Sequence, residues 1–150
     1  MSIADQIARV VPEKQGTPAE IDAIVEIAYL TIAADRRLDD AEIAAFRVVV
    51  ERLRGQPIPD GALDRILDEM YARAERSRGQ QDERLRYLAS KMSTEARERA
   101  YRVAYAMGLA DMDSSDEEFE LDLQLVDALE LTSDRAEELA DEVRETLTPK

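Results

Sequence analysis

The sequence predicts an all-α protein, a single-domain bundle of seven to eight helices over residues 1–150 with an internal duplication of a helix–corner–helix unit. Three observations lead to this fold class. The chain is rich in Ala, Leu, Glu and Arg, which are strong helix formers, and its 45% of apolar residues can supply a sizeable core. Apolar side chains recur with helical spacing over nearly the whole length. No segment shows the alternation of a β-strand.

Two helices are predicted at the start of the chain. A short amphipathic segment covers 3–11. The second helix begins at Pro18 and runs to about residue 34, because Thr17 is a good N-cap and Glu20 completes a capping box. This helix is apolar over so much of its circumference that we expect it at the centre of the fold.

Two more helices complete the first half. Asp39 caps one of them, and Gly55 ends it because glycine readily adopts the left-handed conformation at a helix C-terminus. Regular apolar spacing predicts the other over 61–76. The segment SRGQQ then interrupts the pattern, and we expect the arginines around it to form a solvated face, with a docking patch as the alternative. They are Arg73, Arg76, Arg78, Arg84 and Arg86.

Four predicted helices make up the rest of the chain. A short one covers 82–91, Ser93 caps one that runs to about residue 110, and Ser115 caps one that runs to about residue 130. Thr132 or Ser133 opens the last helix, which continues to residue 147. Serine and threonine suit these places because their hydroxyl oxygens accept hydrogen bonds from the free backbone N–H groups of a helix start.

The two halves of the chain, 17–76 and 93–147, resemble each other at an offset of 76 residues. Residues 28–42, AYLTIAADRRLDDAE, align without a gap with residues 104–118, AYAMGLADMDSSDEE, and six of the fifteen positions are identical. The same offset pairs the predicted N-caps of the two halves. We interpret this as a duplicated helix–corner–helix unit within one domain.

Each half contains an acidic corner between two helices, AADRRLDDAE at 33–42 and LADMDSSDEE at 109–118. Helix capping explains part of this charge. Each corner supplies an N-cap and the acidic residue of a capping box, Asp39 with Glu42 and Ser115 with Glu118. Carboxylates also suit a helix start because of its partial positive charge.

Asp35 and Asp111 need another explanation, because each follows an apolar helix whose negative end disfavours a carboxylate by roughly 0.3–1 kcal/mol. Their side chains could bond to the corner backbone and stabilise the turn. Alternatively, the corner carboxylates converge on a hard cation, for which oxygen ligands are suited, and we expect Ca²⁺ or Mg²⁺. The expected metal ligands are Asp35, Asp39, Glu42, Asp111, Asp113, Ser115 and Glu118.

The second corner is not an EF-hand loop, because Asp116 stands where the sharp turn of that loop needs glycine. Asp122 takes the place that the apolar Phe46 holds in the first half. Two interpretations of this exchange remain open. Either Asp122 is a further oxygen ligand, or Leu123 takes over the core position.

The two corners, AADRRLDDAEIAAF and LADMDSSDEEFELD, resemble those of the TerB-like tellurite-resistance family, which is related to the N-terminal helical domain of membrane-anchored DnaJ-like co-chaperones. The resemblance covers about residues 18–147. It implies an all-helical, non-enzymatic, metal-binding module for bacterial resistance to tellurite and other stresses, associated with the membrane through partner proteins. By position, the family's acidic corner residues fall on Asp35, Asp39, Glu42, Asp111, Ser115 and Glu118.

The chain departs from this family directly after the motif aspartates. The family has glycine there, whereas this sequence has Arg36 and Met112. Arg36 and Arg37 can neutralise the first corner internally, which disfavours a cation there. The second corner contains no basic residue, so we expect it to be the better cation site.

Composition excludes several kinds of chemistry. The chain has no Cys and no His, which removes thiol nucleophiles, disulfides, Cys/His zinc sites and imidazole catalysis. Paired carboxylates could still do general acid–base work, but both corners look exposed and the sequence shows no pocket signature, so we expect neither an enzyme nor an organic cofactor. No segment approaches the roughly 18 apolar residues of a membrane span, and the start of the chain is too short and polar for a signal peptide. We expect a cytoplasmic protein.

The net charge of −14 is concentrated in the last part of the chain. Residues 111–150 contain 15 acidic and 3 basic residues. This distribution disfavours nucleic acid and anionic bilayers as partners and favours a divalent cation or a basic protein surface. The alternative to a cation-binding module is therefore a metal-free interaction scaffold whose acidic C-terminal third docks a basic partner.

Overall fold

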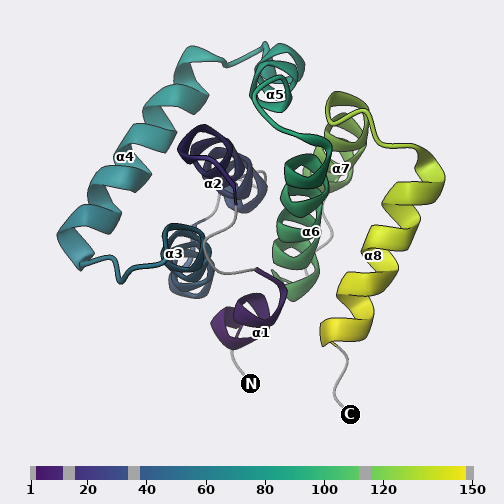
Figure 1. Ribbon diagram of the computed structural model, residues 1–150. Coiled ribbons are helices and arrows are strands. Elements are labelled where there is room, and N and C mark those ends of the chain that lie inside the picture. The colour runs from purple at the N-terminus through teal and green to yellow at the C-terminus, as the bar shows by residue number, and fades with distance from the viewer. Residues whose placement is uncertain (1–2, 12–15, 34–37, 112–115, 148–150) are drawn as a thin grey trace.

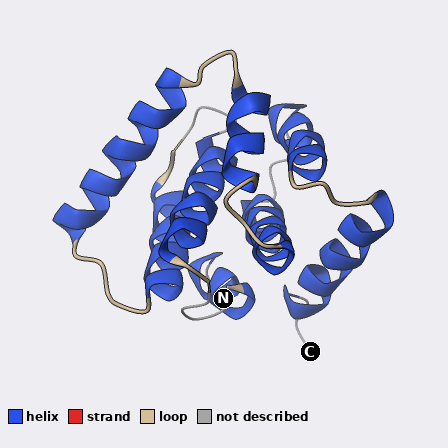
Figure 2. Cartoon of the chain, turned by 45° about the horizontal axis from the view of Figure 1, so that its top comes forward, coloured by secondary structure: helices blue, strands red, loops and turns tan. Residues whose placement is uncertain are grey.

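The computed structural model describes residues 3–11, 16–33, 38–111 and 116–147, which form eight α-helices and no strand (Figures 1 and 2). The predicted all-α class is therefore confirmed, and every predicted helix start lies within one residue of the observed one. The helices are α1 (Ile3–Val10), α2 (Pro18–Ala33), α3 (Asp40–Arg54), α4 (Asp60–Arg76), α5 (Gln81–Ala89), α6 (Thr94–Asp111), α7 (Asp116–Ala128) and α8 (Ser133–Leu147).

The central helix of the fold is α2. Every side chain from Ala23 to Ile32 is buried, on all sides of the helix. It contacts α3, α4, α5 and α6, and Figure 1 shows it between α4 on one side and α6 on the other. A helix that is apolar on all sides removes its side chains from water only when it is surrounded by other helices. Its central place could therefore be predicted from the sequence.

One hydrophobic cluster draws on all eight helices. Representative members, in chain order from α1 to α8, are Ile7, Ile24, Phe46, Met70, Leu88, Met107, Leu125 and Leu139. Within the described residues, no helix combines the length and the apolar character that a membrane span requires.

Glu20 ties the N-terminal ends of α2 and α6 together. Its side chain is buried, and its two oxygens accept hydrogen bonds from the backbone N–H of Thr17 at 2.9 Å and of Ser93 at 2.8 Å. The hydroxyls of these two residues cap α2 and α6 in turn, by accepting from the N–H of Glu20 and of Ala96, both at 3.1 Å. Because α2 and α6 are also in extensive contact, they run in the same general direction from this shared end.

The 76-residue offset of the two halves holds for the helix starts. α2 and α6 begin at residues 18 and 94, and α3 and α7 begin at residues 40 and 116. The common origin of the halves stays a prediction.

Helix α4 lies at the edge of the bundle (Figure 1). Its buried side chains are Leu63, Ile66 and Met70, and none of the residues after Met70 is buried although the helix continues to Arg76. The C-terminal part of α4 therefore covers the core less closely than its first turns do.

In α7, the core positions differ from the prediction. Leu121 and Leu125 are buried, whereas Leu123 is 55% exposed, so the expectation that Leu123 takes over the core position is wrong. Residues four apart lie on the same face of a helix, and a residue midway between them faces the other side.

Candidate functional site

At the first acidic corner, the described carboxylates serve the helix start. Asp39 is the N-cap of α3, and its Oδ1 accepts from the backbone N–H of Glu42 at 2.7 Å. Glu42 is buried, with 6% of its surface exposed. The predicted cap is therefore present, and it occupies one of the oxygens that we expected on a cation. Asp35 lies outside the described residues.

At the second corner, the structure describes less. Asp113 and Ser115 lie outside the described residues. Asp111 is the last residue of α6 and Glu118 belongs to the first turn of α7, but the description does not extend to their side chains. The expected ligand roles of these four residues stay predictions.

The two helices that lead into the corners, α2 and α6, share their starting end. Both helices start beside Glu20 and run in the same general direction, so Ala33 and Asp111, where they end, lie at the opposite end of the pair. Of the seven expected ligands, Asp39 and Glu42 are in contact, but through the backbone N–H of Glu42 and not through its carboxylate. In the part of the chain that the structure describes, no three Asp or Glu side chains come together to hold a metal ion.

Asp122 has a protein partner. Its Oδ1 accepts a hydrogen bond from the hydroxyl of Tyr101 on α6 at 3.0 Å. Burial raises the pKa of Asp122, and the hydrogen bond from Tyr101 opposes this rise. Burial, followed by the nearby Asp122 charge, also raises the pKa of Tyr101. This pairing makes Asp122 a link between α6 and α7, while its interpretation as a further oxygen ligand stays a prediction.

The structure contains a buried charge cluster for which the sequence predicted no site. Glu26, in the middle of α2, is 2% exposed. The Nε and Nη2 of Arg84 donate to its two oxygens at 2.6 and 2.7 Å, and the Nη1 of Arg73 donates to Oε1 at 3.0 Å. The expectation that Arg73 and Arg84 belong to a solvated face is therefore wrong, because both guanidinium groups turn toward α2.

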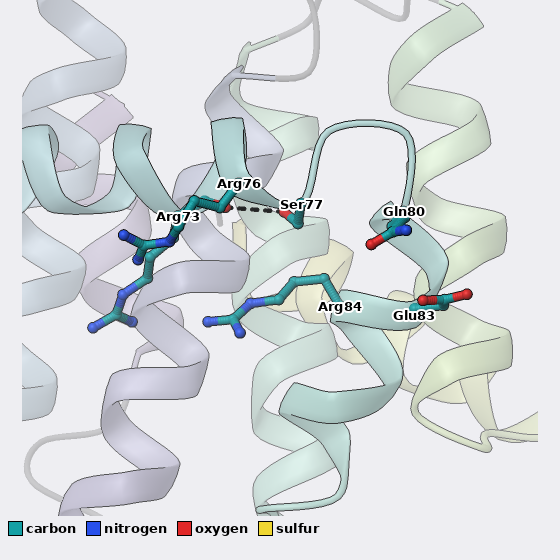
Figure 3. Close-up of a pocket in the computed structure, with 6 residues that line it drawn as sticks. All are labelled: Arg73, Arg76, Ser77, Gln80, Glu83 and Arg84. Carbon is teal, nitrogen blue, oxygen red and sulfur yellow. Dashed lines mark hydrogen bonds between the residues drawn. The ribbon is translucent and has the colours of Figure 1, made fainter.

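Figure 3 shows the cavity beside this cluster, at the α4–α5 connection. Its volume is about 280 Å³. The lining side chains are Arg73, Arg76, Ser77, Gln80, Glu83 and Arg84.

The charges in this cluster compensate one another. Arg73 also donates to Asp22 at 2.9 Å and to Glu69 at 2.6 Å. Burial alone would lower the pKa of Arg73, but the hydrogen bonds to these carboxylates and to Glu26 raise it. The hydrogen bond to Glu26 likewise raises the pKa of Arg84. The cluster thus links α2, α4 and α5, and its sequence signal was one glutamate within the apolar run IVEIAYLTIA.

The outer face of α8 is acidic. Besides Glu142, which pairs with Arg102, five exposed carboxylates recur with helical spacing, at Asp134, Glu137, Glu138, Asp141 and Glu145. The opposite face carries the buried residues Ala136, Leu139, Ala140 and Val143. The two basic residues of the helix, Arg135 and Arg144, are both engaged with carboxylates. We call these five carboxylates, Asp134, Glu137, Glu138, Asp141 and Glu145, the α8 acidic face.

No protein-family model, no curated protein and no solved structure matches this chain.

Proposed function

We propose that this protein is a non-enzymatic acidic helical module of the cytoplasm that binds a divalent cation, Ca²⁺ or Mg²⁺, at its acidic corners. The resemblance of the corners to the TerB-like family supports this proposal and suggests a role in resistance to tellurite or related stress. The observation that supports it is the shared start of α2 and α6 at Glu20, because the two helices that lead into the corners then run in the same general direction to Ala33 and Asp111.

The second corner is the preferred cation site in this proposal. At the first corner, Asp39 already caps α3, and Arg36 and Arg37 stand nearby in the sequence. The segment from 109 to 118 contains five carboxylates and no basic residue. Because like charges so close together repel one another, a bound cation would relieve an electrostatic cost there.

A cation titration tests this function. Protein stripped with EDTA is titrated with Ca²⁺, Mg²⁺ and Mn²⁺ in thermal unfolding and calorimetry. A cation that binds only the folded state, at a hundredfold excess over its Kd, stabilises by about 2.7 kcal/mol, which corresponds to a Tm increase of roughly 5–10 °C. Unchanged Tm at millimolar concentrations of all three ions would exclude the cation site.

Paired variants locate the cation. The double variant Asp111→Ala with Glu118→Ala is expected to lose the stabilisation by the ion. The control Asp134→Ala with Glu137→Ala removes the same charge from the α8 acidic face and is expected to keep it. If both double variants lose the effect equally, the ion responds to the net charge and has no site at the corner.

A second candidate function is docking of a basic protein surface, favoured by the α8 acidic face. Within the described residues, Asp134, Glu137 and Glu145 have no ion-pair partner. These charges add to the excess of 15 acidic over 3 basic residues after position 110. Such a complex is expected to weaken with salt and to ignore EDTA, because screening acts on exposed charges.

A lysine-rich helical peptide is the probe for this second function. Its binding is measured by calorimetry at low and at physiological salt, with EDTA present. Asp134→Asn with Glu137→Asn is expected to weaken it more than Asp64→Asn with Asp68→Asn, which makes the same charge change on α4. Equal losses would show non-specific attraction and contradict a docking face on α8.

A further inference from the structure

A second cavity lies between α2 and the C-terminal part of α4, with a volume of about 420 Å³. It exists because the buried residues of α4 stop at Met70, so the last turns of this helix cover α2 loosely. Its lining includes Tyr29, Leu38, Tyr71, Ala74, Glu75 and Arg78. The volume falls in the range of about 300–1,000 Å³ that is typical of small-molecule sites.

Apolar surface is concentrated at this cavity. Among the described residues, four large hydrophobic side chains are exposed, and two of them, Leu38 at 42% and Tyr71 at 59%, line it. Exposed apolar side chains that gather around one hollow are typical of a place that a ligand covers.

Tyr29 provides a separate observation. Its side chain is 3% exposed, and its ring meets Phe46 edge-on at a centroid distance of 6.2 Å. Its hydroxyl has no hydrogen-bond partner in the described part of the chain. The other buried tyrosine, Tyr101, donates to Asp122, and Tyr105, which matches Tyr29 at the 76-residue offset, accepts from Arg144. Among the described residues, the fully buried side-chain polar atom without a partner is Gln124 Oε1, so the unpaired Tyr29 hydroxyl is not sealed in the core. It opens into the cavity that Tyr29 lines, where a ligand can accept its hydrogen bond.

The surroundings of Tyr29 keep its hydroxyl protonated. Burial raises the pKa of Tyr29, and the neighbouring Tyr71 and Glu75, both on the cavity wall, raise it further. At neutral pH the group is therefore a hydrogen-bond donor. It faces the same space as Tyr71 and Glu75.

The cavity wall carries one acidic and one basic side chain, Glu75 and Arg78. Glu75 and Arg78 lie 3.9 Å apart, and their side chains are 49% and 74% exposed. A charged ligand would be attracted by one of them and repelled by the other. The wall therefore favours an uncharged molecule.

We propose that the cavity between α2 and α4 binds a small uncharged molecule with an apolar body and one acceptor oxygen, which receives the hydrogen bond of the Tyr29 hydroxyl. The apolar body would rest against Leu38, Ala74 and the ring of Tyr71. This site is independent of the proposed cation site, so either can fail without the other.

Two probes of the same shape test the site. Acetophenone carries a ketone oxygen, and α-methylstyrene has a CH₂ group in its place. Binding is followed through the NMR signals of ¹³C-labelled tyrosine rings. Both probes are expected to shift the Tyr29 and Tyr71 signals and leave Tyr105 unchanged, with acetophenone bound more tightly. Absence of saturable shifts up to the solubility limit of acetophenone overturns the proposal.

Three variants assign the contacts. Tyr29→Phe removes the hydroxyl alone. It is expected to weaken the binding of acetophenone by up to about tenfold and to leave the affinity for α-methylstyrene unchanged within about twofold. Tyr105→Phe makes the same change at the matching position and is expected to affect neither probe. Ala74→Phe fills the cavity and is expected to abolish binding of both, with the helical circular dichroism retained. Unchanged acetophenone binding in Tyr29→Phe, or retained binding in Ala74→Phe, refutes the site.

Discussion

Replacing Glu26 by glutamine removes the one negative charge that Arg73 and Arg84 share in the interior. Both carboxylate oxygens accept hydrogen bonds, at 2.6 to 3.0 Å, and the residue is 2% exposed. Glutamine keeps the volume but retains one acceptor oxygen and directs an NH₂ group at a guanidinium. The variant therefore leaves positive charge near the core without its counter-charge.

The expected cost follows from this geometry. Removing one partner of a fully buried ion pair costs about 3–5 kcal/mol. Two features reduce it here, since the Arg84 side chain is 26% exposed and Arg73 keeps Asp22 and Glu69. We expect Glu26→Gln to lower the free energy of unfolding by about 2–3 kcal/mol, out of the roughly 5–15 kcal/mol of a typical domain.

Urea unfolding, followed by far-UV circular dichroism, measures this loss. The matched control is Asp127→Asn, the same acid-to-amide change in the Arg86–Asp127 pair, whose side chains are 62% and 72% exposed. Exposed pairs contribute little, so the control is expected to cost less than about 1 kcal/mol. If Glu26→Gln costs no more than Asp127→Asn at equal m-values, the buried cluster does not stabilise the fold and the reasoning is refuted.

Three further variants test the helix ends and the α6–α7 link in the same assay. Asp39→Ala should lower the free energy of unfolding by about 1 kcal/mol, because α3 loses its cap, whereas a cost near zero would contradict that role. Glu20→Gln should cost about 1.5–3 kcal/mol at pH 7. Since hydrogen bonds from Ser93 and Thr17 lower the pKa of Glu20, this difference should shrink as the pH falls below 4.5, and a pH-independent difference would argue against it. Tyr101→Phe removes the hydrogen bond that the Asp122 carboxylate accepts, and it should lower the free energy of unfolding by about 1–2 kcal/mol at pH 7. This cost should be smaller at acidic pH, below the raised pKa of Asp122, because the protonated carboxyl depends less on the donor.

Local patterns account for the parts of the fold that were predicted. The N-cap of α3 needs residues three positions apart, and Gly55 ends this helix in the left-handed conformation, at φ 72°. The interior place of α2 follows from its lack of a polar face. Of the candidate cation site, the described residues bear out the capping of α3 by Asp39, while the cation itself stays a prediction.

By itself, the sequence determined the all-helical class and, to within about one residue, where each helix begins, because helix formation and capping depend on residues within about one turn. Only the tertiary structure decided which charges meet. Glu20 accepts from Ser93, 73 positions away, and Glu26 meets Arg84, 58 positions away. Periodicity shows which face of a helix is buried, but the partner of that face depends on how the helices pack. For the same reason, the cavity beside Tyr29 could not be predicted, since it arises from how loosely α4 covers α2.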